Sequence, residues 1–222
     1  MAALAVGLAL IAGAQADENG RLIPPQVVGL EPSDITGFDE FPGPVRNLLE
    51  RALALTRRNL GYRFGSSDPA LGGMDCSGTI FHLLSEVGID GVPRSAEAMY
   101  RWVLKKGTFK PGDAVTGESP AFAALRPGDL LFWSGTYAAG GPDTVTHVMI
   151  YLGRAKADGL PLMVGASDGR TYRGRKCFGV SVFEFRLPGE GSPGRFVGFA
   201  RVPGLMRSGP RPEASRAVQG AR

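Results

Sequence analysis

The spacing of apolar residues changes near residue 128, and this change limits the folds open to the chain. Before it, apolar residues recur every three or four positions within 44–60, 75–87 and 95–106, the period of an α-helix. After it come segments rich in Val, Phe, Ile and Tyr with short connections, which predict antiparallel strands at 129–133, 145–152, 160–166, 179–185 and 196–202. Helices followed by strands predict an α+β domain, with helices packed on an antiparallel sheet of about five strands.

The two ends of the chain lack this periodicity. Residues 1–16 are apolar and close on Ala14-Gln15-Ala16, a cleavage pattern that predicts a signal peptide and export to the periplasm or the exterior. A disordered Ala-rich terminus is the alternative, and the run is too short for a stable membrane span. Pro-containing residues 17–43 are interpreted as a linker, and the polar, basic residues 203–222 as a disordered tail. The predicted domain therefore covers 44–202.

The amino-acid composition limits the classes of molecule that the chain could bind. The 222 residues carry a net charge of +4, which suits an acidic polymer. No aromatic pattern is interleaved with the basic residues, so we expect no nucleic-acid binding. The two cysteines form no CxxC pair, which argues against a disulfide framework or a metal knuckle. We expect a monomer without a metal or a cofactor.

Cys76 stands between Asp75 and Ser77, at the start of a predicted helix. The positive end of a helix dipole and its free N–H groups favour the thiolate, which is the reactive form of cysteine. The backbone N–H of Cys76 is a natural oxyanion donor. A buried structural cysteine is the alternative, although such cysteines are usually flanked by apolar residues.

Only two histidines could serve such a thiol as a base, His82 and His147. His147 opens a predicted strand, where alternation places it on the same face as Met149 and Tyr151. His82 follows Cys76 on the same helix but lies off the Cys76 face. His147 is therefore the candidate base, since a nucleophilic Cys and its His are distant in sequence and close in space.

Four blocks of the chain resemble the NlpC-type family of papain-like cell-wall cysteine peptidases. They are 60–66 (LGYRFGS), 75–78 (DCSG), 125–133 (LRPGDLLFW) and 147–153 (HVMIYLG), and their order and spacing match the family across 44–202. The resemblance implies a papain-like fold in which the nucleophile begins a helix. It also implies a hydrolase that cuts peptidoglycan stem peptides, for example at γ-D-glutamyl–diaminopimelate.

In that scheme Cys76 attacks the peptide carbonyl, while His147 takes the thiol proton and returns it to the leaving amine. Tyr62 matches the family's active-site tyrosine, for which a packing role is the alternative. Asp75 and Ser77 match positions that bind substrate in some relatives, and Asp75 is equally well explained as a helix N-cap.

The third catalytic position departs from the family. Relatives usually carry a histidine there, on the next strand, whereas this chain has Gly165. Asp168 or Ser167 could orient His147 instead, as could a water or a main-chain carbonyl, and a plain turn at 167–169 is the alternative.

The same departure keeps two other functions open: an inactive wall-binding module, and another thiol-dependent amidase or acyltransferase. The basic run 170–176 is either a solvated loop or a contact with carboxylates of the wall.

Overall fold

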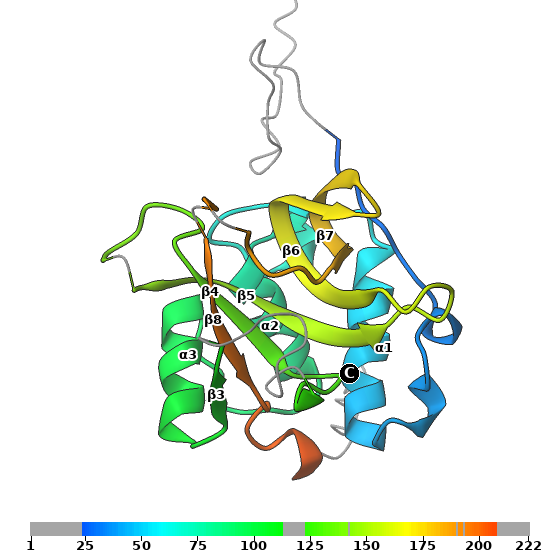
Figure 1. The fold of residues 1–222 in the computed structure, drawn as a ribbon, viewed down its shortest axis with the longest axis horizontal. Coiled ribbons are helices and arrows are strands. Elements are labelled where there is room, and N and C mark those ends of the chain that lie inside the picture. The colour runs from blue at the N-terminus through cyan, green and yellow to red at the C-terminus, as the bar shows by residue number, and fades with distance from the viewer. Residues whose placement is uncertain (1–23, 113–122, 142, 190, 193, 208–222) are drawn as a thin grey trace, which may run out of the picture.

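The computed structural model describes residues 24–112, 123–141, 143–189, 191–192 and 194–207. Within them, helices α1 (Gly43–Thr56), α2 (Cys76–Glu86) and α3 (Ala96–Lys105) precede the main sheet in sequence. Figure 1 shows the strands of this sheet with the helices arranged around them. The predicted α+β architecture is confirmed, and each helix matches its predicted range to within a few residues.

The main sheet of the described residues has six strands in the order β3-β8-β4-β5-β6-β7, and every neighbouring pair is antiparallel. Its strands are β3 (Phe109–Pro111), β4 (Leu130–Ser134), β5 (Val145–Arg154), β6 (Pro161–Tyr172), β7 (Arg175–Glu184) and β8 (Arg195–Ala200). A short parallel pair, β1 (Gly61–Tyr62) and β2 (Gly73–Met74), lies outside it. The sequence missed β3, a three-residue edge strand that ends in a proline.

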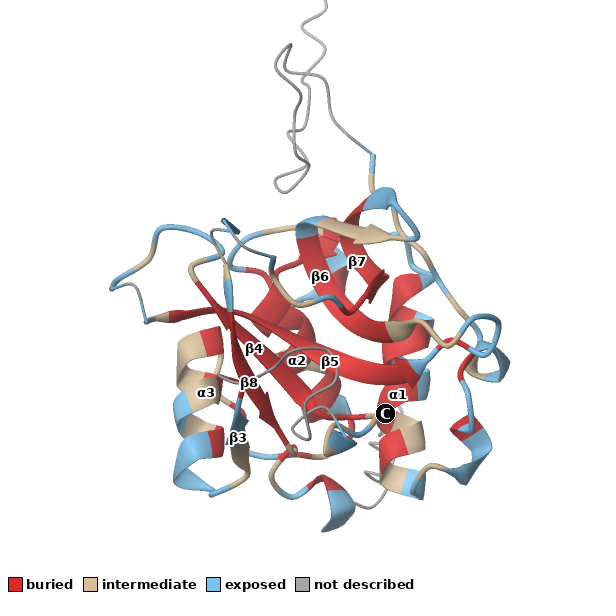
Figure 2. Ribbon diagram, in the orientation of Figure 1, coloured by how far each residue is buried: buried red, intermediate tan, exposed pale blue. Residues whose placement is uncertain are grey.

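The sheet has a core on each face. Figure 2 shows most of its strand residues coloured as buried. Val148, Ile150 and Leu152 of β5 join the helices in one cluster of buried side chains. Met149 and Tyr151 belong to a second cluster on the other face, which is rich in aromatic rings. The observed alternation is the predicted one. It sets the face of the sheet on which each side chain of β5 lies.

The described part of the predicted linker packs along the domain. Gln26 exchanges two backbone hydrogen bonds with Phe178 on the edge strand β7. Further along, Ile35 and Phe38 are buried in the helix-side core, at 2% and 4% exposure. Burying these apolar side chains and pairing an open strand edge both stabilise this segment against the domain.

At the other end, residues 203–207 depart from the predicted disorder. They include a single 3₁₀ turn (Leu205–Arg207), and Leu205 is buried at 4% exposure, which anchors the turn on the core. The predicted signal peptide (1–16) and the remainder of the predicted tail lie outside the described residues. No helix in the described ranges combines the length and the apolar character needed to cross a membrane.

Candidate active site

Cys76 is the first residue of α2, and the sequence around it explains why the helix begins there. Asp75 has extended backbone angles and accepts a hydrogen bond from the N–H of Gly78 at 2.5 Å, so it is the N-cap. Gly78 sits so close to the preceding loop that an added Cβ would lie 2.0 Å from the carbonyl oxygen of Ser66. The absence of a side chain at Gly78, two positions after Cys76, therefore allows this loop to approach the helix tip.

The thiol of Cys76 contacts the main chain on both sides of His147. Sγ lies 3.9 Å from the carbonyl oxygen of Thr146, and the backbone N–H of Val148 points to the sulfur and lowers its pKa. The structure thus brings the predicted nucleophile against the strand segment that carries the predicted base. No hydrogen bond joins Sγ to the imidazole itself, since the ring is bonded elsewhere.

The burial of Cys76 determines the protonation state of its thiol at rest. Cys76 is only 5% exposed, and its burial raises its pKa to about 11, with a smaller contribution from the charge of Asp75. These effects outweigh the backbone N–H groups of Val148, Ser77 and Cys76, which act in the opposite direction. These shifts oppose the thiolate expected from the helix tip, and they favour a neutral Cys76 thiol at neutral pH.

His147 is held near the start of β5. Glu97 on α3 accepts a hydrogen bond from the N–H of Val145 at 2.8 Å, which fixes the beginning of the strand. The imidazole is 7% exposed and meets the indole of Trp133 edge to face, with 5.7 Å between ring centroids. Helix α3 and strand β4 together leave the ring little freedom.

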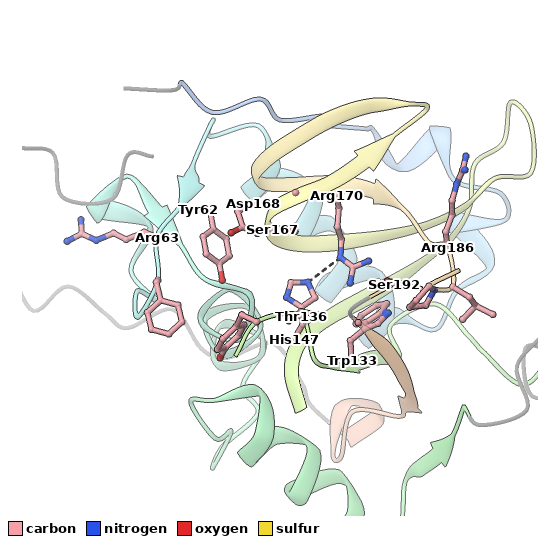
Figure 3. A pocket seen from close by; sticks show the side chains of 16 residues that line it. Tyr62, Arg63, Trp133, Thr136, His147, Ser167, Asp168, Arg170, Arg186 and Ser192 are labelled. Atoms are coloured by element: carbon pink, nitrogen blue, oxygen red, sulfur yellow. Dashed lines mark hydrogen bonds between the residues drawn. The ribbon is translucent and has the colours of Figure 1, made fainter. Parts of the chain in front are cut away.

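Arg170, to which the sequence analysis gave no role beside the base, contacts the imidazole of His147. Arg170 Nε donates to His147 Nε2 at 3.4 Å, and the guanidinium also lies over Trp133, 4.2 Å from the centre of its ring (Figure 3). Burial lowers the pKa of His147 well below its usual value, and the charge of Arg170 lowers it further. Because Nε2 accepts this bond, the single proton of the neutral imidazole belongs on Nδ1.

A β-bulge explains why Arg170 points at His147. The pairing of β6 with β7 shifts between Ser167, which faces Gly179, and Arg170, which faces Cys177. The extra residue returns Arg170 to the sheet face that Ser167 also occupies, although the two are three positions apart. Simple alternation would have turned Arg170 away, so a sequence pattern could not reveal the contact.

The predicted orienters lie nearby without touching the ring. Ser167 is buried and Asp168 is exposed, and within the described residues neither makes a hydrogen bond to His147. At Gly165, the position to which the resemblance assigns the third catalytic residue, an added Cβ would lie 2.3 Å from the sulfur of Met149. The space of the usual third residue is therefore filled from β5, and the donor to the ring comes from further along β6.

Asp75 is a structural centre as well as a predicted substrate residue. Its carboxylate accepts five hydrogen bonds, from the N–H groups of Gly65 and Gly78, from the hydroxyl of Ser77 and from two nitrogens of Arg94. Arg94 also donates to Ser77 at 3.0 Å. The sequence analysis gave Arg94 no role, yet this side chain joins both predicted substrate residues.

Two pockets meet at this site. The His147 pocket, a cleft of about 730 Å³, is lined by His147, Ser167, Asp168 and Arg170 among others (Figure 3). The smaller Cys76 pocket, of about 310 Å³, is lined by Cys76, Asp75, Ser77 and Arg94 among others. Tyr62, Phe64 and Tyr137 border both pockets.

Tyr62 stands where the two pockets join. Its burial raises the pKa of its phenol, and the charges of Cys76 and Asp168 raise it further. The hydroxyl therefore stays protonated at neutral pH and can donate a hydrogen bond to a bound group. Its position beside the thiol agrees with the role implied by the resemblance, while its function stays a prediction.

Comparison with known proteins agrees with this geometry. The sequence profile of the NlpC/P60 family matches residues 59–157, a segment that contains both Cys76 and His147. The NlpC/P60 match ends before the bulge of β6, so Arg170 lies outside it.

A gamma-DL-glutamyl hydrolase from Bacillus subtilis (strain 168) is 32% identical over 95 residues, which are 43% of this chain and 18% of that protein. The crystal structure of a protein "similar to lipoprotein, NLP/P60 family" from Staphylococcus aureus aligns with a TM-score of 0.45 at 24% identity, over 72% of this chain and 41% of that one. The chain thus spans well under half the length of either protein.

Proposed function

We propose that this protein is an exported cysteine peptidase that hydrolyses peptide bonds in peptidoglycan stem peptides, such as γ-D-glutamyl–diaminopimelate. The observation that carries the proposal is the contact of Cys76 Sγ with the main chain on both sides of His147. The NlpC/P60 match and the hydrolase relative support a hydrolase, and the name of that relative supports a glutamyl bond as its target.

The pKa shifts favour general-base catalysis over a preformed ion pair. The raised pKa of Cys76 and the lowered pKa of His147 both favour the neutral thiol and the neutral imidazole at rest. Cys76 then attacks the carbonyl carbon as its proton passes to Nε2 of the ring, once Arg170 Nε has released that nitrogen, and the S–C bond of a tetrahedral intermediate forms. The imidazolium protonates the leaving amine as the C–N bond breaks, and water hydrolyses the resulting thioester.

The two pockets indicate the orientation in which the substrate peptide binds. Because His147 lines the larger pocket and must protonate the leaving amine, the leaving residue belongs in the His147 pocket. The acyl part then occupies the Cys76 pocket, beside Asp75, Ser77 and Arg94. Tyr62 borders both pockets and is placed to contact the peptide at the bond that is cut.

The test is mass spectrometry of purified stem peptides after incubation with the protein. We expect cleavage at the γ-D-glutamyl bond by the wild type and none by Cys76→Ala, with unchanged circular dichroism. Cys177→Ala is the matched control, because Cys177 is a free thiol buried in the aromatic-rich core. Cleavage by Cys76→Ala at the wild-type rate would exclude the thiol mechanism.

A wall-binding module of little activity is the second candidate. It is favoured by the raised thiol pKa together with the absence of a hydrogen bond between Cys76 and the imidazole. Retention on purified peptidoglycan sacculi without release of peptides would identify this function.

A further inference from the structure

Arg170 carries a charge that no acidic side chain balances. Within the described residues it forms no ion pair, and its two Nη groups donate no hydrogen bond, since the contact with His147 uses Nε. Burial lowers the pKa of Arg170 to about 10, against the attraction of Cys76, so the guanidinium stays charged at neutral pH. A partly buried cation without an anion is costly, which makes it a strong site for one.

The other arginines of the same pocket are already engaged. Arg186 pairs with Glu184 at 2.9 Å, and Arg63 donates to the carbonyl oxygen of Leu71 at 3.1 Å. Figure 3 shows the Arg63 side chain directed away from the pocket, whereas the guanidinium of Arg170 lies between His147 and Trp133. Arg170 is therefore the arginine of this pocket that lies against His147 and whose two Nη groups keep all their donors.

Stacking on Trp133 orients the guanidinium of Arg170 for binding a planar carboxylate. The Trp133 ring covers one face of it at 4.2 Å, which fixes its plane and leaves its edge open. Two parallel N–H groups on that edge match the two oxygens of a carboxylate, an arrangement that binds more strongly than a single hydrogen bond. The pocket that holds Arg170 is also the pocket into which His147 would release the leaving amine.

We propose that Arg170 is a specificity residue that binds a carboxylate on the leaving-group residue of the substrate. The proposal rests on the proposed function for the direction of the peptide. On a γ-D-glutamyl–diaminopimelate bond, the carboxylate belongs to the diaminopimelate residue. The protein should therefore bind a residue with a free carboxylate more tightly than the corresponding amide at this position. Contacts with the peptide backbone alone would not distinguish the two.

The experiment compares two peptides in equilibrium binding. One is γ-D-glutamyl–diaminopimelate, and the other is the same peptide with its diaminopimelate carboxylates amidated. Both are titrated calorimetrically into Cys76→Ala, so that turnover does not enter. We expect the acid to bind about ten- to a hundredfold more tightly than the amide, the range for hydrogen bonds to charged groups. Adding Arg170→Gln should abolish this preference, and Arg170→Lys should keep part of it.

Arg63→Gln is the matched control, because Arg63 borders the same pocket but its charged end is directed away from it and does not contact His147. We expect this variant to keep the full preference for the acid. If the preference survives in Arg170→Gln, or if neither peptide binds, the proposed carboxylate contact is wrong. If the preference depends on Arg170 but the wild type cuts neither peptide, the contact stands and the peptidase function fails.

Discussion

The two pockets that meet at Tyr62 differ in how their charges are satisfied. In the Cys76 pocket, Asp75 accepts five hydrogen bonds and Arg94 binds both Asp75 and Ser77. In the His147 pocket, Arg170 meets a ring face and an imidazole but no acid, and Asp168 is exposed. The first pocket uses its polar groups to hold the helix tip in place, and the second leaves polar groups available to a ligand.

Mutations in the two pockets should therefore affect different properties: stability in the first, and catalysis or binding in the second. A group that is saturated inside the protein should affect stability first, because its loss leaves buried partners unpaired. A group in the open pocket should affect catalysis or binding first. The following variants test that division.

Replacing His147 with Ala should produce the largest effect on rate. Removing the general base should lower kcat by about 10²–10⁴-fold. Steady-state kinetics on the cleaved stem peptide measures the rate. His82→Ala, on the outer part of α2 and 3.9 Å from Glu86, is the control and should keep wild-type kinetics. A wild-type kcat for His147→Ala would show that another group accepts the proton.

Replacing Asp75 with Ala should affect stability more than any change in the open pocket. The variant loses the N-cap of α2 and leaves Arg94 without its acid, so we expect unfolding to become easier by about 2–4 kcal/mol. Urea denaturation measures the change. Ser95→Ala is the matched control, because Ser95 caps α3 through a single exposed hydrogen bond, and its loss should cost about 1 kcal/mol. Equal costs for the two variants would contradict the distinction between the pockets.

The pH dependence of thiol alkylation tests the protonation state of Cys76 in the smaller pocket. With a pKa of about 11, Cys76 is almost entirely protonated at pH 7, so iodoacetamide should react slowly. The rate should rise about tenfold for each unit of pH until it levels off near that pKa. Mass spectrometry of the Cys177→Ala variant follows Cys76 alone. A rate that is flat between pH 6 and 8 would indicate a thiolate already present at rest.

The sequence predicted the scaffold well because each helix carries its own signals. Asp75 and Ser95 both cap the helices that were expected to start beside them, and the apolar period of β5 places His147 and Val148 on opposite faces as predicted. Such features depend on neighbours a few residues away, which periodicity and capping rules describe.

The sequence could not predict the electrostatics of the site. Arg170 looked like one of several basic residues in a loop, and only the bulge in β6 turns it toward His147. The thiol pKa depends on how deeply the helix tip is buried under strand β5, a tertiary property that outweighs the local helix dipole. The absence of a histidine at Gly165 was visible, but its reason, the sulfur of Met149, required the register of β5 against β6.

The two cysteines are free and lie in different cores of the domain. Cys76 belongs to the helix-side cluster, whereas Cys177 is 0% exposed within the aromatic cluster across the sheet. A disulfide requires the two Cβ atoms to approach within about 4.5 Å, which here would require the strands between them to part. An oxidising environment can therefore leave Cys76 without a disulfide to the other cysteine of its own chain.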